Sequence, residues 1–141
     1  MARPPTAAGE PNGTRVLLEC AEHADPDVIA GVLRRAGYEV TVCHGPDARH
    51  HCDALTSGAC DDVDAADVVV NLLSTHTGDE IAATVARSKP GQGLVVEVGL
   101  PSTSRPEAPA WPEGVELIRT PITGDALLGA VERATRSAQP V

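Results

Sequence analysis

The stretch from Asp67 to Leu73, DVVVNLL, decides the fold of this chain. Three consecutive valines are followed by one polar residue, Asn71, and then by two leucines. A short continuous apolar run is typical of a strand in a parallel sheet, because helices bury both faces of such a sheet. We therefore predict that residues 67–73 form the central strand of an α/β protein.

Four other segments have the composition of strands and lie on both sides of this one in the sequence. Each is short, apolar and rich in branched residues, as buried strands are. They are residues 15–21, 38–43, 94–98 and 115–118. Strands that alternate with helices through right-handed crossovers form a parallel sheet with helices on both faces, and we predict this architecture here.

Three helices are marked by residues at their ends. Asp25 stands at an N-cap, with a proline at the first helical position, and Gly37 follows the last apolar residue of that helix. Gly78-Asp79-Glu80 opens the second helix, and Thr123 caps the third. The capping residues therefore predict where each helix begins.

Two segments are irregular, and they help to set the domain boundaries. Residues 44–66 have at best one short helix, and residues 100–114 contain four prolines and must form an extended loop. The chain of 141 residues is long enough for one packed core. We predict a disordered lead over residues 1–14, one domain over 15–136 and a tail over 137–141.

The charge and hydropathy of the chain exclude several classes of function. It has 20 acidic and 11 basic side chains, for a formal charge of −9, and no cluster of Lys or Arg. Such a chain is unsuited to the phosphates of nucleic acids. No apolar run approaches the ~20 residues that cross a bilayer, and the start has neither the basic nor the apolar region of a signal peptide. We expect a cytoplasmic protein with no nucleic-acid or membrane partner.

Three stretches of the chain share a pattern with a known family. They are RVLLECAEHADPD at 15–27, RRAGYEV at 34–40 and TPITGDALLGAVERA at 120–134. In this order and spacing they resemble the receiver domain of response regulators. The likeness covers roughly residues 15–136. It implies a flavodoxin-like, five-stranded parallel sheet of order 2-1-3-4-5 with helices on both faces, in which the Pro-rich loop replaces the family's fourth helix.

The resemblance also implies where a phosphorylation pocket would lie. In the family, an acidic pair after strand one binds magnesium, an Asp ending strand three takes the phosphoryl group, a Ser or Thr follows strand four and a Lys follows strand five. The corresponding positions here are Cys20 and Ala21, or Glu19 and Cys20 if the register slips by one, then Asn71 or Leu72, Val98 and Thr120.

These residues lack the groups that phosphoryl transfer uses. The amide of Asn71 cannot form an acyl phosphate, and Thr120 cannot supply the missing cation. Glu19, Glu22 and His23 could keep some affinity for a metal, but solvated loop residues explain them more simply. The resemblance therefore implies a degenerate pseudo-receiver that is not an enzyme.

Trp111, the single Trp, stands in the Pro-rich loop. It could anchor a contact with another protein, or it could cover the edge of the sheet, which is the simpler role for a lone Trp among prolines. Receivers commonly use their fourth helix, with strand five and helix five, to contact partners. A loop in that place implies a different partner surface, and we expect a protein partner, a homodimer being one form of it.

Four cysteines and His44 form the other candidate site. Cys43, Cys52 and Cys60 are separated by eight and seven residues, and Cys20 ends the neighbouring strand. Three or four of these ligands could hold zinc or iron, although paired C-x-x-C motifs are absent. Two alternatives stay open. Cys20 and Cys43 could be small buried strand residues, or the loop could hold a redox pair, Cys52 with Cys60 or Cys43 with Cys52.

Two hypotheses for the function follow from these observations. The first is a stand-alone pseudo-receiver, a protein-interaction or regulatory module that works without phosphorylation. The second is a sensor of metal or of thiol oxidation that uses residues 43–60. A small-molecule enzyme or carrier ranks last, because no polar constellation at the predicted strand ends is organised for catalysis.

Overall fold

A computed structural model of the chain describes residues 13–45, 52, 60–73, 75–89, 91–98, 111–119 and 121–138. Most of the predicted lead and tail, and most of the predicted loop over 100–114, lie outside the described residues. None of the described helices is long and apolar enough to cross a lipid bilayer.

Five parallel strands form one sheet in the order β2-β1-β3-β4-β5. The strands are β1 Arg15–Glu19, β2 Glu39–Cys43, β3 Val68–Asn71, β4 Gly93–Val98 and β5 Glu116–Arg119. The predicted fold class and strand order are confirmed. All five predicted strands are present, with ends that differ by one or two residues, as expected for element boundaries.

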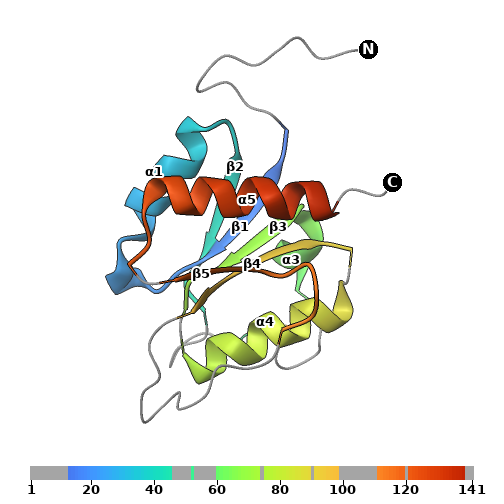
Figure 1. Cartoon of the computed structure of the whole chain (residues 1–141). Coiled ribbons are helices and arrows are strands. Elements are labelled where there is room, and N and C mark those ends of the chain that lie inside the picture. The colour runs from blue at the N-terminus through green and yellow to red at the C-terminus, as the bar shows by residue number, and fades with distance from the viewer. Residues whose placement is uncertain are drawn as a thin grey trace.

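Helices cover both faces of the sheet (Figure 1). Helices α1 and α5 pack on one face, and α3 and α4 pack on the other. Their bounds are α1 Pro26–Arg35, α3 Asp61–Ala65, α4 His76–Ser88 and α5 Gly124–Ala138, and a short 3-10 turn, η1, spans Glu22–Ala24. We call the core between the sheet and α1/α5 the first cluster, and the core between the sheet and α3/α4 the second cluster.

The central strands are buried on both faces, as the run DVVVNLL predicted. In β3, Val68, Val69 and Val70 are fully buried, and in β1 the apolar residues alternate between the two clusters. Glu19 and Asn71 end these two strands and are the buried polar side chains among the described residues. The fold therefore places two polar groups side by side at the carboxyl edge of the sheet, where open α/β sheets hold their functional sites.

The predicted starts of α1 and α5 are confirmed, and the predicted start of α4 is wrong. Thr123 caps α5 as expected, because its Oγ1 accepts from the backbone N–H of Ala126 at 3.1 Å. Asp25 does stand before α1, but its φ of 56° is left-handed and its side chain makes no capping bond. Helix α4 begins at His76, not Gly78, because Thr75 caps it through a 2.9 Å bond from the Gly78 N–H.

Candidate functional site

The strand register brings Glu19 and Asn71 together. Glu19 lies opposite Asn71 on one side and opposite Cys43 on the other. Side chains alternate along a strand, and Leu17 and Val69, two residues earlier, belong to the second cluster. Glu19 and Asn71 therefore face the α3/α4 side of the sheet at its carboxyl edge.

This register places the alternative pocket positions implied by the resemblance on opposite faces of the sheet. Cys20 and Leu72 belong to the first cluster, so their side chains point to the opposite face. Val98 is half-buried at the end of β4, opposite Arg119, and Thr120 lies outside the described residues. Of the implied pocket positions, the structure juxtaposes Glu19 and Asn71.

Asn71 joins the end of β3 to the start of α4. Its Nδ2 donates to the backbone carbonyl of Gly78 at 2.9 Å, and its Oδ1 accepts from the N–H of Leu73 at 3.2 Å. The side chain is 2% exposed, so these bonds are shielded from water. Both ends of the amide are therefore used to hold the connection between β3 and α4.

Glycine at position 78 is required by close packing of this connection. A Cβ on Gly78 would lie 2.7 Å from the Cβ of Leu73 and 3.2 Å from Oγ1 of Thr75. Neither neighbour is the end of a flexible chain, so the backbone would have to shift. The sequence offered Gly78 only as a helix-opening residue, and its contact with Leu73 depends on the tertiary packing.

Replacing Gly78 with Ala should lower the free energy of unfolding by about 1–3 kcal/mol, because overpacking outweighs the gain in helix propensity. A matched control is Gly129→Ala in α5, where the added Cβ meets the flexible end of Arg133 at 3.3 Å. That change should stabilise the chain by up to about 1 kcal/mol. Urea unfolding of both variants measures the difference, and equal effects of the two changes would contradict the packing.

Glu19 is a carboxyl group in an apolar place. Its side chain is 3% exposed, and its Oε1 has no hydrogen-bond partner within the described part of the chain. Burial raises the pKa of Glu19 from 4.5 to about 7, and a hydrogen bond from Asn71 offsets part of that rise. The interpretation of Glu19 as a solvated loop acid is wrong, whereas Glu22 and His23 are exposed as expected.

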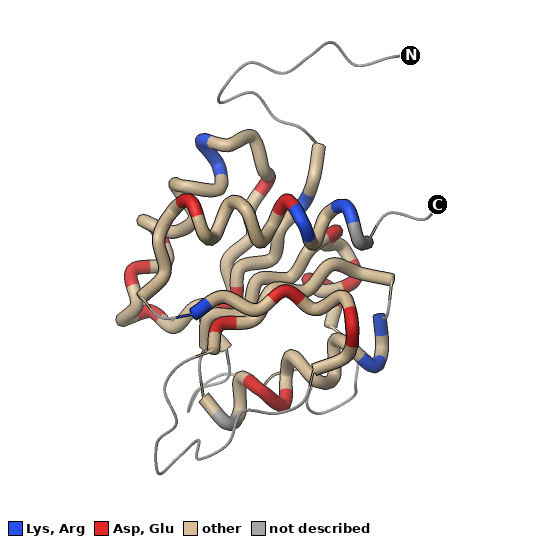
Figure 2. The backbone as a smooth tube through the Cα atoms, in the orientation of Figure 1, with Lys and Arg blue, Asp and Glu red and all other residues tan. Residues whose placement is uncertain are grey.

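A shallow acidic cavity lies beside η1 and the start of α1. It has a volume of about 320 Å³ and is lined by acidic residues of η1 and α1 together with Val28 and His44. The acidic residues are Glu22, Asp25 and Asp27. Figure 2 shows this concentration of negative charge around η1 and the start of α1.

The described residues do not support the predicted metal site. Among them, no three His, Cys, Asp or Glu side chains converge closely enough to hold a metal ion. The fold explains this for two of the predicted ligands. Cys20 is turned into the first cluster, away from Cys43, which packs on the second. The Nδ1 of His44 donates to the backbone carbonyl of Cys20 at 3.0 Å.

The cysteines of the second face form a separate group. All four cysteines of the chain are outside disulfide bonds, and Cys43 and Cys60 both pack against the second cluster. Burial raises the pKa of Cys43, a backbone hydrogen bond from Gly45 lowers it, and the negative charges of Glu19, Cys60 and Cys52 raise it again. These charges act on Cys43 because they lie within electrostatic reach of its sulfur.

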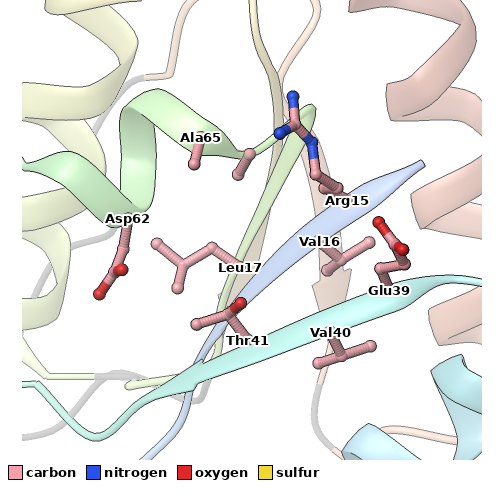
Figure 3. A pocket seen from close by; sticks show the side chains of 9 residues that line it. Arg15, Val16, Leu17, Glu39, Val40, Thr41, Asp62 and Ala65 are labelled. Carbon is pink, nitrogen blue, oxygen red and sulfur yellow. The ribbon is translucent and has the colours of Figure 1, made fainter. Parts of the chain in front are cut away.

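A groove separates α3 from β2 on this face (Figure 3). Its volume is about 290 Å³. Asp62 and Ala65 of α3 form one wall, and Glu39 and Thr41 of β2 form the other, with Leu17 between them (Figure 3). The groove is polar on its walls and apolar at its floor.

Trp111 packs against the second cluster beside the sheet. Its side chain is half-buried, and its indole Nε1 is buried with no hydrogen-bond partner in the described residues. This packing is the covering role that the sequence favoured. The alternative, an anchor for another protein, stays a prediction.

Solved structures of response-regulator receivers share this fold. One from Sinorhizobium medicae superposes with a TM-score of 0.62 at 21% identity, over 91% of this chain and 98% of that one. Receiver domains from Clostridium thermocellum and Methanospirillum hungatei give TM-scores of 0.62 and 0.59, at 18% and 17% identity. They cover 87% and 88% of this chain, and 94% and 95% of their own.

No protein-family model matches the sequence, and no curated protein matches it. A structural likeness at identities this low shows the receiver fold and does not show the role of any site residue. The receiver resemblance inferred from the three sequence stretches is thus confirmed at the level of the fold.

Proposed function

We propose that this chain is a regulatory module that binds a protein partner through the receiver fold and does not accept a phosphoryl group. The observation that carries the proposal is the buried pair of Glu19 and Asn71 at the ends of β1 and β3. In receivers, this edge of the sheet holds carboxylates that bind magnesium and take the phosphate. One acid and one amide replace them here.

The chemistry of this pair supports a module without phosphorylation. An amide is not a nucleophile for phosphoryl transfer, and the Asn71 amide is already committed to Gly78 and Leu73. A carboxyl with a pKa of about 7 is a poor ligand for magnesium near neutral pH, because a proton competes with the metal. Catalysis of phosphoryl transfer depends on such positioned charges, so the proposed role is binding.

The proposed partner contacts the surface beside the acidic cavity. Val28 is 66% exposed and lines that cavity among its three acidic residues. An exposed apolar side chain within a charged rim is typical of a protein-interaction surface. A partner segment with basic and apolar side chains would complement it.

The direct test is phosphorylation by a small phosphodonor. The purified chain is incubated with acetyl phosphate and Mg²⁺, and intact-mass spectrometry measures adducts. A receiver domain that retains the acceptor Asp is labelled in the same tube as a positive control. We expect no phosphoryl adduct on this chain, and a stoichiometric adduct would contradict the proposal.

A further inference from the structure

Cys43 and Cys60 belong to the two elements that border the groove, because Cys43 ends β2 and Cys60 immediately precedes α3. Side chains of β2 alternate, so Cys43 follows Glu39 and Thr41 on the face that looks into the groove. On the opposite wall, Cys60 is the N-cap of α3, one residue before the helix begins. Each of the two elements that border the groove therefore has one cysteine at its end or next to it.

The direction of α3 brings these two thiols toward each other. The helix is followed by Asp67, whose N–H donates to the Arg15 carbonyl at 2.8 Å at the amino edge of the sheet. Because α3 runs toward that edge, its first residue lies toward the carboxyl edge, where β2 ends at Cys43. Cys43 and Cys60 therefore both lie toward the carboxyl edge of the sheet.

Packing and electrostatics agree with this placement. Cys43 and Cys60 are both half-buried and both pack against the second cluster, whereas Cys20 is fully buried in the first. The Cys60 side chain makes no capping bond to α3, so its sulfur is not committed to the helix. Burial is the main cause that raises the pKa of Cys43, and the charge of Cys60 is one of its smaller causes, beside those of Glu19 and Cys52.

We propose that Cys43 and Cys60 form a reversible disulfide that joins β2 to α3 and closes one end of the groove. This inference does not depend on how the Glu19–Asn71 pair behaves toward phosphate. It differs from the redox pairs considered from the sequence, which both included Cys52, because the direction of α3 could not be read from spacing.

The reaction needs a peroxide as the oxidant. The Cys60 sulfur attacks hydrogen peroxide, which gives the sulfenic acid and hydroxide. The Cys43 thiol then attacks the sulfenic sulfur and displaces water, so that two thiols are oxidised and one peroxide is reduced to two waters. We assign the second step to half-buried Cys43, because burial raises its pKa and so disfavours its thiolate. A thiol reductant restores both cysteines.

The consequence for the fold is a covalent link across residues 44–59. Closing a loop of this length restricts the unfolded chain, so the oxidised form should melt several degrees higher than the reduced form. The link also fixes the two walls of the groove relative to each other. The oxidation state of the two cysteines would therefore determine whether the two walls of the groove are held in a fixed position relative to each other.

The test is oxidation of the full chain at low micromolar concentration with hydrogen peroxide, followed by thiol counting under denaturing conditions and peptide mapping. The four thiols of the chain should fall to two, the bond should map to Cys43 and Cys60, and the melting temperature should rise. Cys52→Ser is the matched control, and it should fall from three thiols to one. Cys43→Ser and Cys60→Ser should each keep three thiols after the same treatment.

Three results would overturn the proposal. The first is that wild type keeps all four thiols after treatment. The second is a bond that maps to Cys52 or Cys20, and the third is a disulfide that links two chains. Because the count and the map are made on wild type, the conclusion stands even where a serine variant does not fold.

Discussion

Replacing Glu19 with Gln should raise the free energy of unfolding by about 3 kcal/mol at pH 8 and leave it nearly unchanged at pH 4. The wild-type carboxyl must ionise in a buried site at pH 8, and its Oε1 has no hydrogen-bond partner in the described part of the chain. Gln has the shape of the protonated acid and carries no charge, so the cost of burying a charge disappears.

The sign follows from the pKa of Glu19 in the two states. Folding raises that pKa from 4.5 to about 7, so the folded state binds more protons than the unfolded state between these values. The contribution of Glu19 to stability is therefore complete below about pH 4.5 and is lost as the pH rises through 7. A difference of about 2.5 pKa units corresponds to about 3 kcal/mol.

Chemical unfolding at several pH values measures this prediction. The stability of Glu19→Gln should lose the decline that wild type shows between about pH 4.5 and 7. Glu22→Gln, which removes an exposed carboxyl of η1, is the matched control and should change stability by less than about 0.5 kcal/mol. A loss of stability in Glu19→Gln at pH 8 would contradict the raised pKa of the buried Glu19 carboxyl.

Replacing Asn71 with Asp should destabilise the chain by about 3 kcal/mol or more at pH 8. The change removes the Nδ2 donor that bonds the Gly78 carbonyl and places a second carboxyl opposite Glu19. Two buried acids that face each other on neighbouring strands repel each other when both are ionised. The new carboxylate also faces the Gly78 carbonyl oxygen, to which it cannot donate a hydrogen bond. Much of this loss should be recovered near pH 4, where a protonated Asp can donate again.

Asn71→Leu separates charge from hydrogen bonding at this position. It has a similar shape and loses the same bonds without adding a charge. Its destabilisation should depend on pH far less than that of Asn71→Asp, with a small extra loss at pH 8 because Glu19 also loses the hydrogen bond from Asn71. Unfolding curves of both variants at pH 4 and pH 8 provide the comparison. An Asn71→Asp chain as stable as wild type at pH 8 would show that the site tolerates two carboxylates, as a receiver pocket does, and would contradict the account of a closed acid and amide pair.

The sheet could be predicted because its strands are buried on both faces. The run Val68–Val70 has no polar residue to interrupt it, and the turn and capping residues between strands are specific enough to fix the element order. The burial of both faces also means that the sequence pattern does not show the register of the strands. Residues 16–20 are apolar except for Glu19, so the pattern does not say which side chains face which cluster, and a slip by one residue exchanges the faces.

The site could be predicted only in part, because its features depend on tertiary packing. The sequence placed Glu19 among loop acids because an acid at the end of an apolar run is usually solvated. Its burial becomes visible only when α3 and α4 cover that edge. The start of α4 was mispredicted for a similar reason. Gly78-Asp79-Glu80 is a stronger helix-start signal in the sequence than Thr75, which caps the helix in the structure.

In the proposed function, the buried pair of Glu19 and Asn71 takes the place of a cation site. A ¹³C NMR titration of the Glu19 carboxyl, assigned by comparison with Glu19→Gln and run with and without Mg²⁺, tests this proposal. We expect a midpoint near 7 that does not move when Mg²⁺ is added. A midpoint near 4.5, or one that Mg²⁺ lowers, would show a solvated or cation-binding carboxyl and would overturn the proposal.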